Sequence, residues 1–366
     1  MARIVSIIGT RPEIIKMAPV IRELDRIGHE HILVHSGQHY DLMMDGIFFK
    51  ELELRSPDEQ IEIGGLPPHK QIAATMDQLG DVVSKADMVV VQGDTNTTLS
   101  GAMLANKLGK TLGHVEAGMR SFDRNMPEEH NRVLADHLSD ILFAPSKLSI
   151  VNLENEGLRK GVHLTGNTGV DAALQHIKIA HERSRILQGL RLKPDSFFLV
   201  TFHRTENADN PKKLRNVLVA LSSIATKHGK EVVFPIHPRT RRRVKEFGLE
   251  GLLAGEGIRV IDPIGYFDTL ILEETSSLIL TDSGGLQEEA CTLHIPCVTL
   301  RENTERPETL DIGCNVLAGT DIKRIEKATA KQLRFSGKWK NPYGDGTAGK
   351  KIAAIVKKFY DKRGAS

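Results

Sequence analysis

The chain has 366 residues, with 49 lysines and arginines against 47 aspartates and glutamates, so its formal net charge is +2. This length fits two domains, and a charge so close to zero argues against a nucleic acid or an anionic membrane as partner. No apolar run approaches the roughly 18–20 residues that cross a bilayer. The start, Met1–Gly9, is too soon polar for a signal peptide. Three cysteines without metal-type spacing indicate reduced thiols, so we expect a cytoplasmic protein.

Short apolar runs alternate with amphipathic stretches along the chain, which predicts parallel strands covered by helices. In the first half, the predicted strands are Ile4–Ile8, His31–Val34, Met88–Val91, Thr111–Val115, Ile141–Ala144 and Val162–Thr165. In the second half, they are Phe197–Thr201, Glu231–Ile236, Ile258–Ile261, Leu278–Leu280, Cys297–Leu300 and Asn315–Leu317. The pattern predicts two doubly wound α/β domains, 1–185 and 186–349, with a linker near 185–195. The last helix, Lys350–Lys362, could complete the second domain or cross back onto the first.

Polar residues follow many of the predicted strands. In doubly wound sheets, ligands bind outside the carboxyl ends of the strands. The residues found there are Arg11 and Lys16 after the first strand, Asp94, Glu116, His203, and the turn Ser283-Gly284-Gly285. Cations and carboxylates on two such edges would suit a site that binds an anion and also moves protons.

Each of these features also has an ordinary structural interpretation. The Ser283 turn could bind a phosphate at a helix N-terminus or could simply cap that helix. Asp94 could likewise be a helix cap, and Glu128 could form an i,i+4 pair with Arg132. Arg11 at a helix start is unfavourable against the helix dipole, which favours an anionic partner. No GxGxxG follows the first strand, so a nicotinamide site is not predicted.

Seven sequence blocks occur in order along nearly the whole chain. They are Gly9-Thr-Arg-Pro-Glu-Ile-Ile-Lys16-Met-Ala-Pro19, Gly93-Asp-Thr-Asn-Thr-Thr98, Gly113-His-Val-Glu-Ala-Gly118, Pro127-Glu-Glu-His-Asn-Arg132, Leu280-Thr-Asp-Ser-Gly-Gly-Leu-Gln-Glu-Glu289, Thr304-Glu-Arg-Pro-Glu308 and Asn341-Pro-Tyr-Gly-Asp-Gly346. Together they resemble the non-hydrolysing UDP-N-acetylglucosamine 2-epimerase family. The resemblance implies the α/β GT-B architecture, with two Rossmann-like domains, a cleft between them, and the helix 350–366 packed back on the first domain. It also implies a cytoplasmic homodimer.

The activity that the resemblance implies is reversible 2-epimerisation of UDP-GlcNAc to UDP-ManNAc for surface polysaccharide. The family mechanism eliminates UDP to give 2-acetamidoglucal and then adds it back, without a metal or other cofactor. Three alternatives stay open: an epimerase for another UDP-2-acetamido sugar, a GT-B glycosyltransferase or hydrolysing relative, and a sugar-nucleotide sensor without activity. The retained carboxylates argue against the sensor.

Site roles carry over only to matching positions. The resemblance implies a diphosphate site formed by Arg11, His203, Ser283, Gly284 and Gly285, with Arg306 nearby. Glu289 would hold the ribose, and the loop Pro263–Thr269, with Ile264 and Thr269, would hold the uracil largely through backbone groups. The residues expected around the sugar, with catalytic roles, are Lys16, Asp94, Glu116, Glu128, Arg132 and His203. After Gln38-His39, this chain has Tyr40-Asp41-Leu42-Met43 where the family commonly has Arg-x-Met-Leu. Bacterial members use that stretch for a second, regulatory UDP-GlcNAc, so the departure leaves such regulation open.

Overall fold

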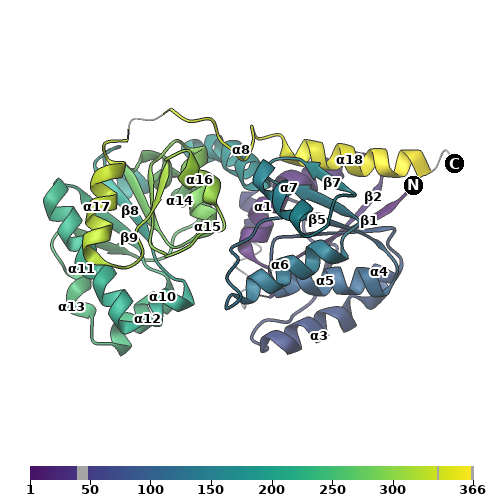
Figure 1. The fold of residues 1–366 in the computed structure, drawn as a ribbon, viewed down its shortest axis with the longest axis horizontal. Helices are drawn as coiled ribbons and strands as arrows, with labels where there is room; N and C mark the ends of the chain where they lie inside the picture. The colour runs from purple at the N-terminus through teal and green to yellow at the C-terminus, as the bar shows by residue number, and fades with distance from the viewer. Residues whose placement is uncertain (39–47, 336–337, 364–366) are drawn as a thin grey trace. The chain divides into compact units, whose positions relative to one another are not determined.

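The computed structural model describes residues 1–38, 48–335 and 338–363, and the chain divides into two compact units (Figure 1). Unit 1 comprises Met1–Ala172 and Tyr343–Ser366, and unit 2 comprises Ala173–Pro342. The first boundary between the units follows Ala172, inside helix α8 (Thr168–Arg183), whereas the sequence predicted it between residues 185 and 186. The second boundary follows Pro342, inside the turn 341–346, whereas the sequence predicted it between residues 349 and 350. Because α8 continues through the first boundary, no loop-like composition marks that boundary in the sequence.

Unit 1 is built on a seven-stranded sheet in the order β3-β2-β1-β4-β5-β6-β7, with every neighbouring pair parallel. The strands are β1 (Arg3–Ile8), β2 (Glu30–His35), β3 (Glu59–Gln60), β4 (Met88–Gln92), β5 (Thr111–Val115), β6 (Ile141–Ala144) and β7 (Val162–Leu164). All six strands expected in this half are present. The edge strand β3 was not predicted, because two residues carry no periodicity.

The helices of unit 1 bury the sheet on both faces. They include α1 (Arg11–Leu24), α3 (Pro68–Gln78), α4 (Gly80–Ser84), α5 (Asn96–Lys107), α6 (Pro127–Leu138), α7 (Lys147–Asn155) and α18 (Ala348–Arg363). Val5 and Ile7 of β1 share a core with Ala102 of α5 and Ala135 of α6. The alternate residues Ile4 and Ile8 are equally buried. Burial of both faces explains why these strands are mostly apolar.

Helix α18 packs against α1 within unit 1 (Figure 1, yellow). The Asp171 carboxylate caps it by accepting hydrogen bonds from the backbone N–H groups of Ala348 (3.0 Å) and Gly349 (2.8 Å). At Gly349, an added Cβ would lie 2.8 Å from the Pro19 carbonyl oxygen. The two helices therefore touch at a point where only glycine fits.

Unit 2 is built on a six-stranded parallel sheet in the order β10-β9-β8-β11-β12-β13. The strands are β8 (Phe197–Thr201), β9 (Glu231–Pro235), β10 (Ile258–Ile261), β11 (Leu278–Thr281), β12 (Cys297–Thr299) and β13 (Asn315–Leu317). The helices include α9 (Ile186–Leu190), α10 (Thr205–Ala208), α11 (Pro211–His228), α12 (Pro238–Glu246), α13 (Glu250–Leu253), α14 (Tyr266–Thr275), α15 (Gly284–Thr292), α16 (Pro307–Asp311) and α17 (Ile322–Gln332). Phe198 and Val200 pack toward α11 and α17, and Phe197 and Leu199 pack toward α14 and α15. Each half thus follows the predicted doubly wound pattern.

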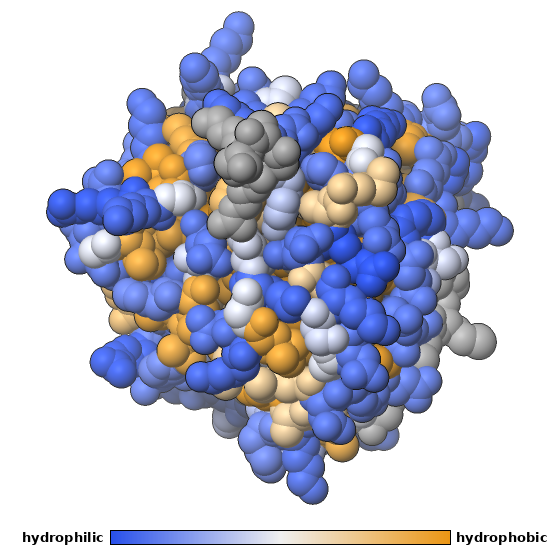
Figure 2. All heavy atoms as spheres, turned by 90° about the vertical axis from the view of Figure 1, so that its right-hand side faces the viewer, coloured by the Kyte–Doolittle hydropathy of each residue, from blue (hydrophilic) through white to orange (hydrophobic). Residues whose placement is uncertain are grey.

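Few of the residues that the structure describes are large, apolar and exposed. On the face drawn in Figure 2, hydrophobic side chains lie in small groups among hydrophilic ones. Apart from Met1, the large hydrophobic residue with the greatest exposure among the described residues is Phe122, at 74%. In the part of the chain that the structure describes, no helix has the length and apolarity needed to span a membrane.

Candidate functional site

A buried cluster joins α1, β4 and β5 at the carboxyl edge of the unit 1 sheet. The Lys16 Nζ atom lies 2.5 Å from Glu116 Oε1, and the two side chains are only 12% and 7% exposed. The other Glu116 oxygen, Oε2, accepts a hydrogen bond from the Gln92 side chain at the end of β4. Strands β1, β4 and β5 are neighbours in the sheet, which is why residues far apart in sequence meet here.

The backbone of Glu116 is strained. Its φ is 70°, a left-handed conformation that costs a residue with a Cβ about 1–2 kcal/mol. Such outliers persist where surrounding contacts hold them, and they concentrate at functional sites. The strain and the buried Lys16 pair together favour a functional Glu116 over a simple helix cap.

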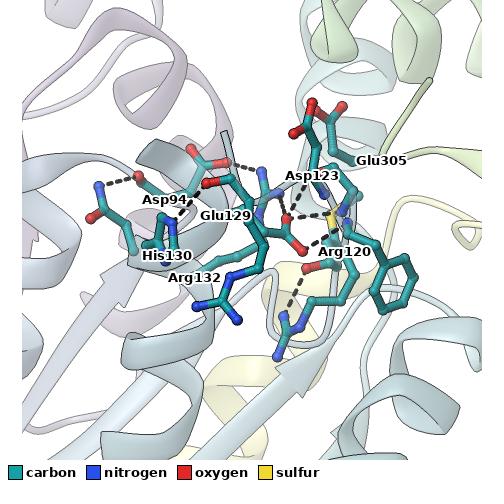
Figure 3. Close-up of polar contacts among 12 residues, drawn as sticks. Asp94, Arg120, Asp123, Glu129, His130, Arg132 and Glu305 are labelled. Carbon is teal, nitrogen blue, oxygen red and sulfur yellow. Dashed lines mark hydrogen bonds and ion pairs between the residues drawn. The ribbon is translucent and has the colours of Figure 1, made fainter. Parts of the chain in front are cut away.

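A second cluster surrounds Arg132 on α6 (Figure 3). One guanidinium nitrogen pairs with Asp94 Oδ2, and another lies 2.5 Å from Glu129 Oε2. The Asn131 side-chain amide donates to the Asp94 carbonyl oxygen at 2.9 Å, which fixes the turn after β4. Arg132 thus pairs with Glu129 and Asp94 rather than forming the i,i+4 pair with Glu128 that was the alternative interpretation. The fold brings Asp94, in the turn after β4, to the Arg132 guanidinium. A rule based on spacing within one helix does not include a residue from another part of the chain.

Glu129 was missed by the sequence analysis. Its carboxylate accepts hydrogen bonds from the Ser121 N–H, the Ser121 hydroxyl and the Phe122 N–H, each at 2.9 Å. Burial opposes ionisation, but these hydrogen bonds and the Arg132 charge outweigh it and lower the pKa of Glu129. The Pro127-Glu-Glu block contains two adjacent carboxylates, and nothing in the spacing tells which one faces inward.

Glu13 was also missed, although it lies between Arg11 and Lys16. Its buried carboxylate accepts hydrogen bonds from the Gly9 N–H (2.9 Å), the Thr95 hydroxyl (2.8 Å) and the Thr98 hydroxyl (3.2 Å). It thereby ties the turn that carries Arg11 to the turn that carries Asp94. Burial raises the pKa of Glu13 to about 7, because it outweighs the hydrogen bonds that lower it.

This carboxyl should make stability depend on pH. Below about pH 4.5, Glu13 is protonated in both folded and unfolded chains; as the pH rises to about 7, the unfolded chain loses its proton first. Relative to Glu13→Gln, the wild type should lose about 3 kcal/mol of unfolding free energy across this range. Urea denaturation at several pH values measures the difference, with Glu62→Gln at an exposed glutamate as the control. A constant difference between wild type and Glu13→Gln would contradict the expectation.

In unit 2, the Ser283 turn opens helix α15 beside a buried arginine. Ser283 is the N-cap residue, but its side chain makes no capping hydrogen bond. A capping role therefore explains the position of the Ser283 backbone but gives no role to its hydroxyl group. A Cβ added at Gly284 would lie 3.0 Å from the Arg306 guanidinium. Arg306 is held by Glu288 (Nε to Oε1, 2.7 Å) and by Glu305 (3.4 Å). Glycine is therefore needed at 284 to admit this cation.

His203 is fixed next to the same turn by Asp282, a residue that sequence reasoning did not single out. The fully buried Asp282 carboxylate accepts hydrogen bonds from the backbone N–H groups of His203 (3.1 Å) and Arg204 (2.9 Å) and from the Asn207 side chain (3.3 Å). Because Asp282 directly precedes Ser283, it joins the His203 turn to the start of α15. Its place between a buried strand and the Ser-Gly-Gly turn was the signal that could have found it.

Helix α14 packs against α15 and carries the loop expected to hold the nucleoside base. The Thr269 hydroxyl donates to the Gly265 carbonyl oxygen at 2.9 Å, and Ile264 packs on the unit 2 core. Both side chains are thus engaged locally, as suits a loop that binds through its backbone. Glu289, half-buried on α15, lies close enough for its charge to add to burial in raising the pKa of Tyr266.

The structure thus brings together Lys16 with Glu116 and Asp94 with Arg132 in unit 1, and His203 with the Ser283 turn and Gly284 with Arg306 in unit 2. Arg11 begins α1, with its guanidinium 5.3 Å from the Phe48 ring centre. Glu128 lies one residue before Glu129 on α6 and is partly exposed. The departure at Tyr40–Met43 lies outside the described residues.

Two Rossmann-like domains, each with polar residues at the carboxyl edge of its sheet, define an α/β protein of the GT-B type. A family model described as UDP-N-acetylglucosamine 2-epimerase matches residues 22–357, and the chain belongs to that family. A relative from Methanococcus maripaludis, named UDP-N-acetylglucosamine 2-epimerase, is 49% identical over 97% of this chain and 98% of its own. The crystal structure of the Methanocaldococcus jannaschii UDP-GlcNAc 2-epimerase with UDP-GlcNAc and UDP matches with a TM-score of 0.91 at 46% identity, covering 97% of this chain and 99% of that one. A UDP-2,3-diacetamido-2,3-dideoxy-D-glucuronate 2-epimerase from Pseudomonas aeruginosa is 38% identical over 98% of this chain and 100% of its own.

Proposed function

We propose that this protein interconverts UDP-GlcNAc and UDP-ManNAc by inverting the sugar at C2. The observation that carries the proposal is two ion pairs in unit 1 of a chain of this family: the largely buried Lys16–Glu116 pair and the Arg132–Asp94 pair, whose carboxylate is 32% exposed. Two carboxylates held beside two cations supply proton acceptors and donors at one edge of a sheet.

The chemistry needs an indirect path, because the C2 hydrogen of an N-acetylhexosamine is not adjacent to a carbonyl and is not acidic. In the proposed path, the C1–O bond to UDP breaks, a carboxylate takes the C2 proton, and a C1=C2 double bond forms. The intermediate is 2-acetamidoglucal. A proton then returns to the opposite face of C2 while a phosphate oxygen of UDP attacks C1, so atoms and charges balance without a redox cofactor or a metal.

The candidate residues fall into separate sets by the role that we assign to them. We assign proton transfer to Asp94, Glu116 and Glu128, with Lys16 and Arg132 as their cationic partners. The diphosphate is assigned to Arg11, His203, Ser283, Gly284 and Gly285, with Arg306 beneath Gly284. Preorganised cations and N–H groups of this kind stabilise a departing anion. Glu289 is assigned to the ribose, and the loop with Ile264 and Thr269 to the uracil.

Proton NMR of the protein with UDP-GlcNAc in deuterated water tests the activity directly. The expected result is a signal for UDP-ManNAc together with loss of the C2 proton signal, because the shuttled proton exchanges with solvent. Turnover at full rate with the original C2 hydrogen wholly retained would overturn the mechanism. Net release of UDP and free sugar would instead show the hydrolysing alternative, and sugar transfer only with an acceptor would show a glycosyltransferase.

A second candidate substrate is a UDP-2,3-diacetamido sugar, favoured by the full-length similarity to the Pseudomonas aeruginosa epimerase. The two candidates differ at C3 and C6 of the sugar. Comparison of kcat/KM for the two substrates with the same preparation decides between them, and we expect the higher value for UDP-GlcNAc.

Substitution Gly284→Ala should weaken UDP binding. The new methyl group would contact the Arg306 guanidinium at about 3.0 Å, and that cation is fixed by Glu288 and cannot withdraw easily. We expect UDP affinity to fall about tenfold, or roughly 1.4 kcal/mol, measured by isothermal titration calorimetry. Gly251→Ala on α13, where an added Cβ meets nothing within 4 Å, is the matched control. Equal affinity in both variants would contradict the assignment.

We further propose that the protein is a cytoplasmic homodimer that supplies ManNAc-type sugars for surface polysaccharide. Three buried thiols, Cys291, Cys297 and Cys314, are free rather than paired, which suits a reducing compartment. Light scattering after size-exclusion chromatography tests the dimer, and a monomeric mass at micromolar concentration would contradict it.

A further inference from the structure

An unbroken series of polar contacts leads from an exposed loop to Asp94 (Figure 3). The Ser121 and Phe122 N–H groups bind Glu129, Glu129 binds Arg132, and Arg132 binds Asp94. Glu129 is 5% exposed and Arg132 is 4% exposed. The central link of the series is therefore shielded from water, where charge-assisted hydrogen bonds are strongest.

The loop at one end of this series is strained. Phe122 has φ 59°, which for a bulky side chain is an unfavourable conformation, and its 74% exposure means that little packing offsets the cost. The compensation comes from Glu129, whose carboxylate oxygens accept one N–H each from Ser121 and Phe122. The buried Glu129 carboxylate thus helps to hold this backbone in place.

At the other end, Arg132 is shared between two carboxylates. The guanidinium is a planar fork with fixed donor directions, so binding of one nitrogen to Glu129 determines where the nitrogen that meets Asp94 lies. Glu129 and Arg132 are three residues apart on α6, on one face of a rigid helix.

We propose that Glu129 is the positioning residue that sets Arg132, and through it Asp94, for catalysis. This inference rests on the proposed epimerase function. Glu129 itself does not touch the substrate; it orients the guanidinium that orients the carboxylate, and it holds the loop 121–123 at the same time.

The test is a double-mutant cycle on the full chain, with Glu129→Gln, Asp94→Asn and the double variant. Glutamine has the shape of glutamate but lacks the charge and one acceptor, so Arg132 should lose its fixed direction. We expect Glu129→Gln to lower kcat by about 10–100-fold with KM changed less than about threefold. If Glu129 acts through Asp94, the double variant should be no slower than Asp94→Asn alone, because the target of positioning is already gone.

Glu156→Gln is the matched control. Glu156 also binds an arginine of unit 1, because its carboxylate accepts hydrogen bonds from Arg120 Nε and Nη2 at 2.7 Å each. It lies outside the series of contacts that ends at Asp94. Its kcat should stay within about twofold of wild type. Thermal unfolding of each variant shows whether it is folded, and hydrogen exchange at the Ser121 and Phe122 amides, expected to be faster only in Glu129→Gln, gives a readout independent of activity.

The outcomes separate the two proposals. Multiplicative losses in the double variant, or unchanged hydrogen exchange in Glu129→Gln, would overturn the positioning role while leaving an active wild type as an epimerase. A wild type that is folded but does not convert UDP-GlcNAc would overturn the proposed function before the cycle is measured.

Discussion

Asp94→Asn, Glu116→Gln and Glu128→Gln are each expected to lower kcat by about 10²–10⁴-fold, with UDP affinity nearly unchanged. Each substitution nearly keeps the side-chain volume but removes the negative charge and the ability to accept a proton. The proton carrier matters in the transition state and makes no contact with the diphosphate in our assignment. Steady-state kinetics with UDP-GlcNAc, together with calorimetric titration of UDP, separates the two effects.

Arg11→Ala and His203→Ala are the counterparts of these variants. Both remove groups assigned to the diphosphate, so they should weaken UDP binding as well as slow turnover. Near-normal kcat in all three carboxylate variants would show that those residues are structural caps. In that case, the buried Lys16–Glu116 pair would serve folding rather than catalysis.

Asp282→Ala is expected to destabilise unit 2, because each buried donor that is left unsatisfied costs about 1–3 kcal/mol. The substitution leaves the backbone N–H groups of His203 and Arg204 and the Asn207 amide without their common acceptor. Unsatisfied buried donors are costly because the protein offers no water in exchange. UDP affinity should fall as well, since the His203 turn and the Ser283 turn lose the carboxylate that joins them.

The control for this prediction is Asp262→Ala. Asp262 is 90% exposed and pairs only at the surface with Arg241, so its removal should change unfolding free energy by less than about 1 kcal/mol. Urea denaturation and UDP titration of both variants give the comparison. Equal losses in the two variants would show that the contacts of Asp282 do not support the site as described.

The strands could be predicted because their signal is local. Phe197–Thr201 and Thr111–Val115 were predicted with the bounds that the structure has, since a strand buried on both faces is mostly apolar. The edge strand Glu59–Gln60 was not predicted, because only its pairing with β2 defines it as a strand and its two residues show no periodic pattern.

The site could be predicted only in part. The places of Asp94 and Glu116 at the carboxyl edge of the sheet were found because parallel strands present their carboxyl ends on one edge. Glu13, Glu129 and Asp282 were not, because each acts by accepting hydrogen bonds from backbone segments that are distant or oriented by the fold. Spacing alone also could not decide whether Arg132 pairs with Glu128, because the guanidinium binds any carboxylate in reach, including Asp94 in the turn after β4.

The capping of α18 by Asp171 and its contact with α1 at Gly349 have a consequence for synthesis on the ribosome. Helix α18, which packs on α1, is translated only after all of unit 2. The face of α1 that contacts α18 therefore stays exposed while some three hundred residues are synthesised (Figure 1). Unit 2 is contiguous and can fold as it appears, whereas unit 1 must close on itself last. A nascent chain arrested before residue 348 would therefore expose an apolar surface to chaperones, although its seven-stranded sheet is already complete.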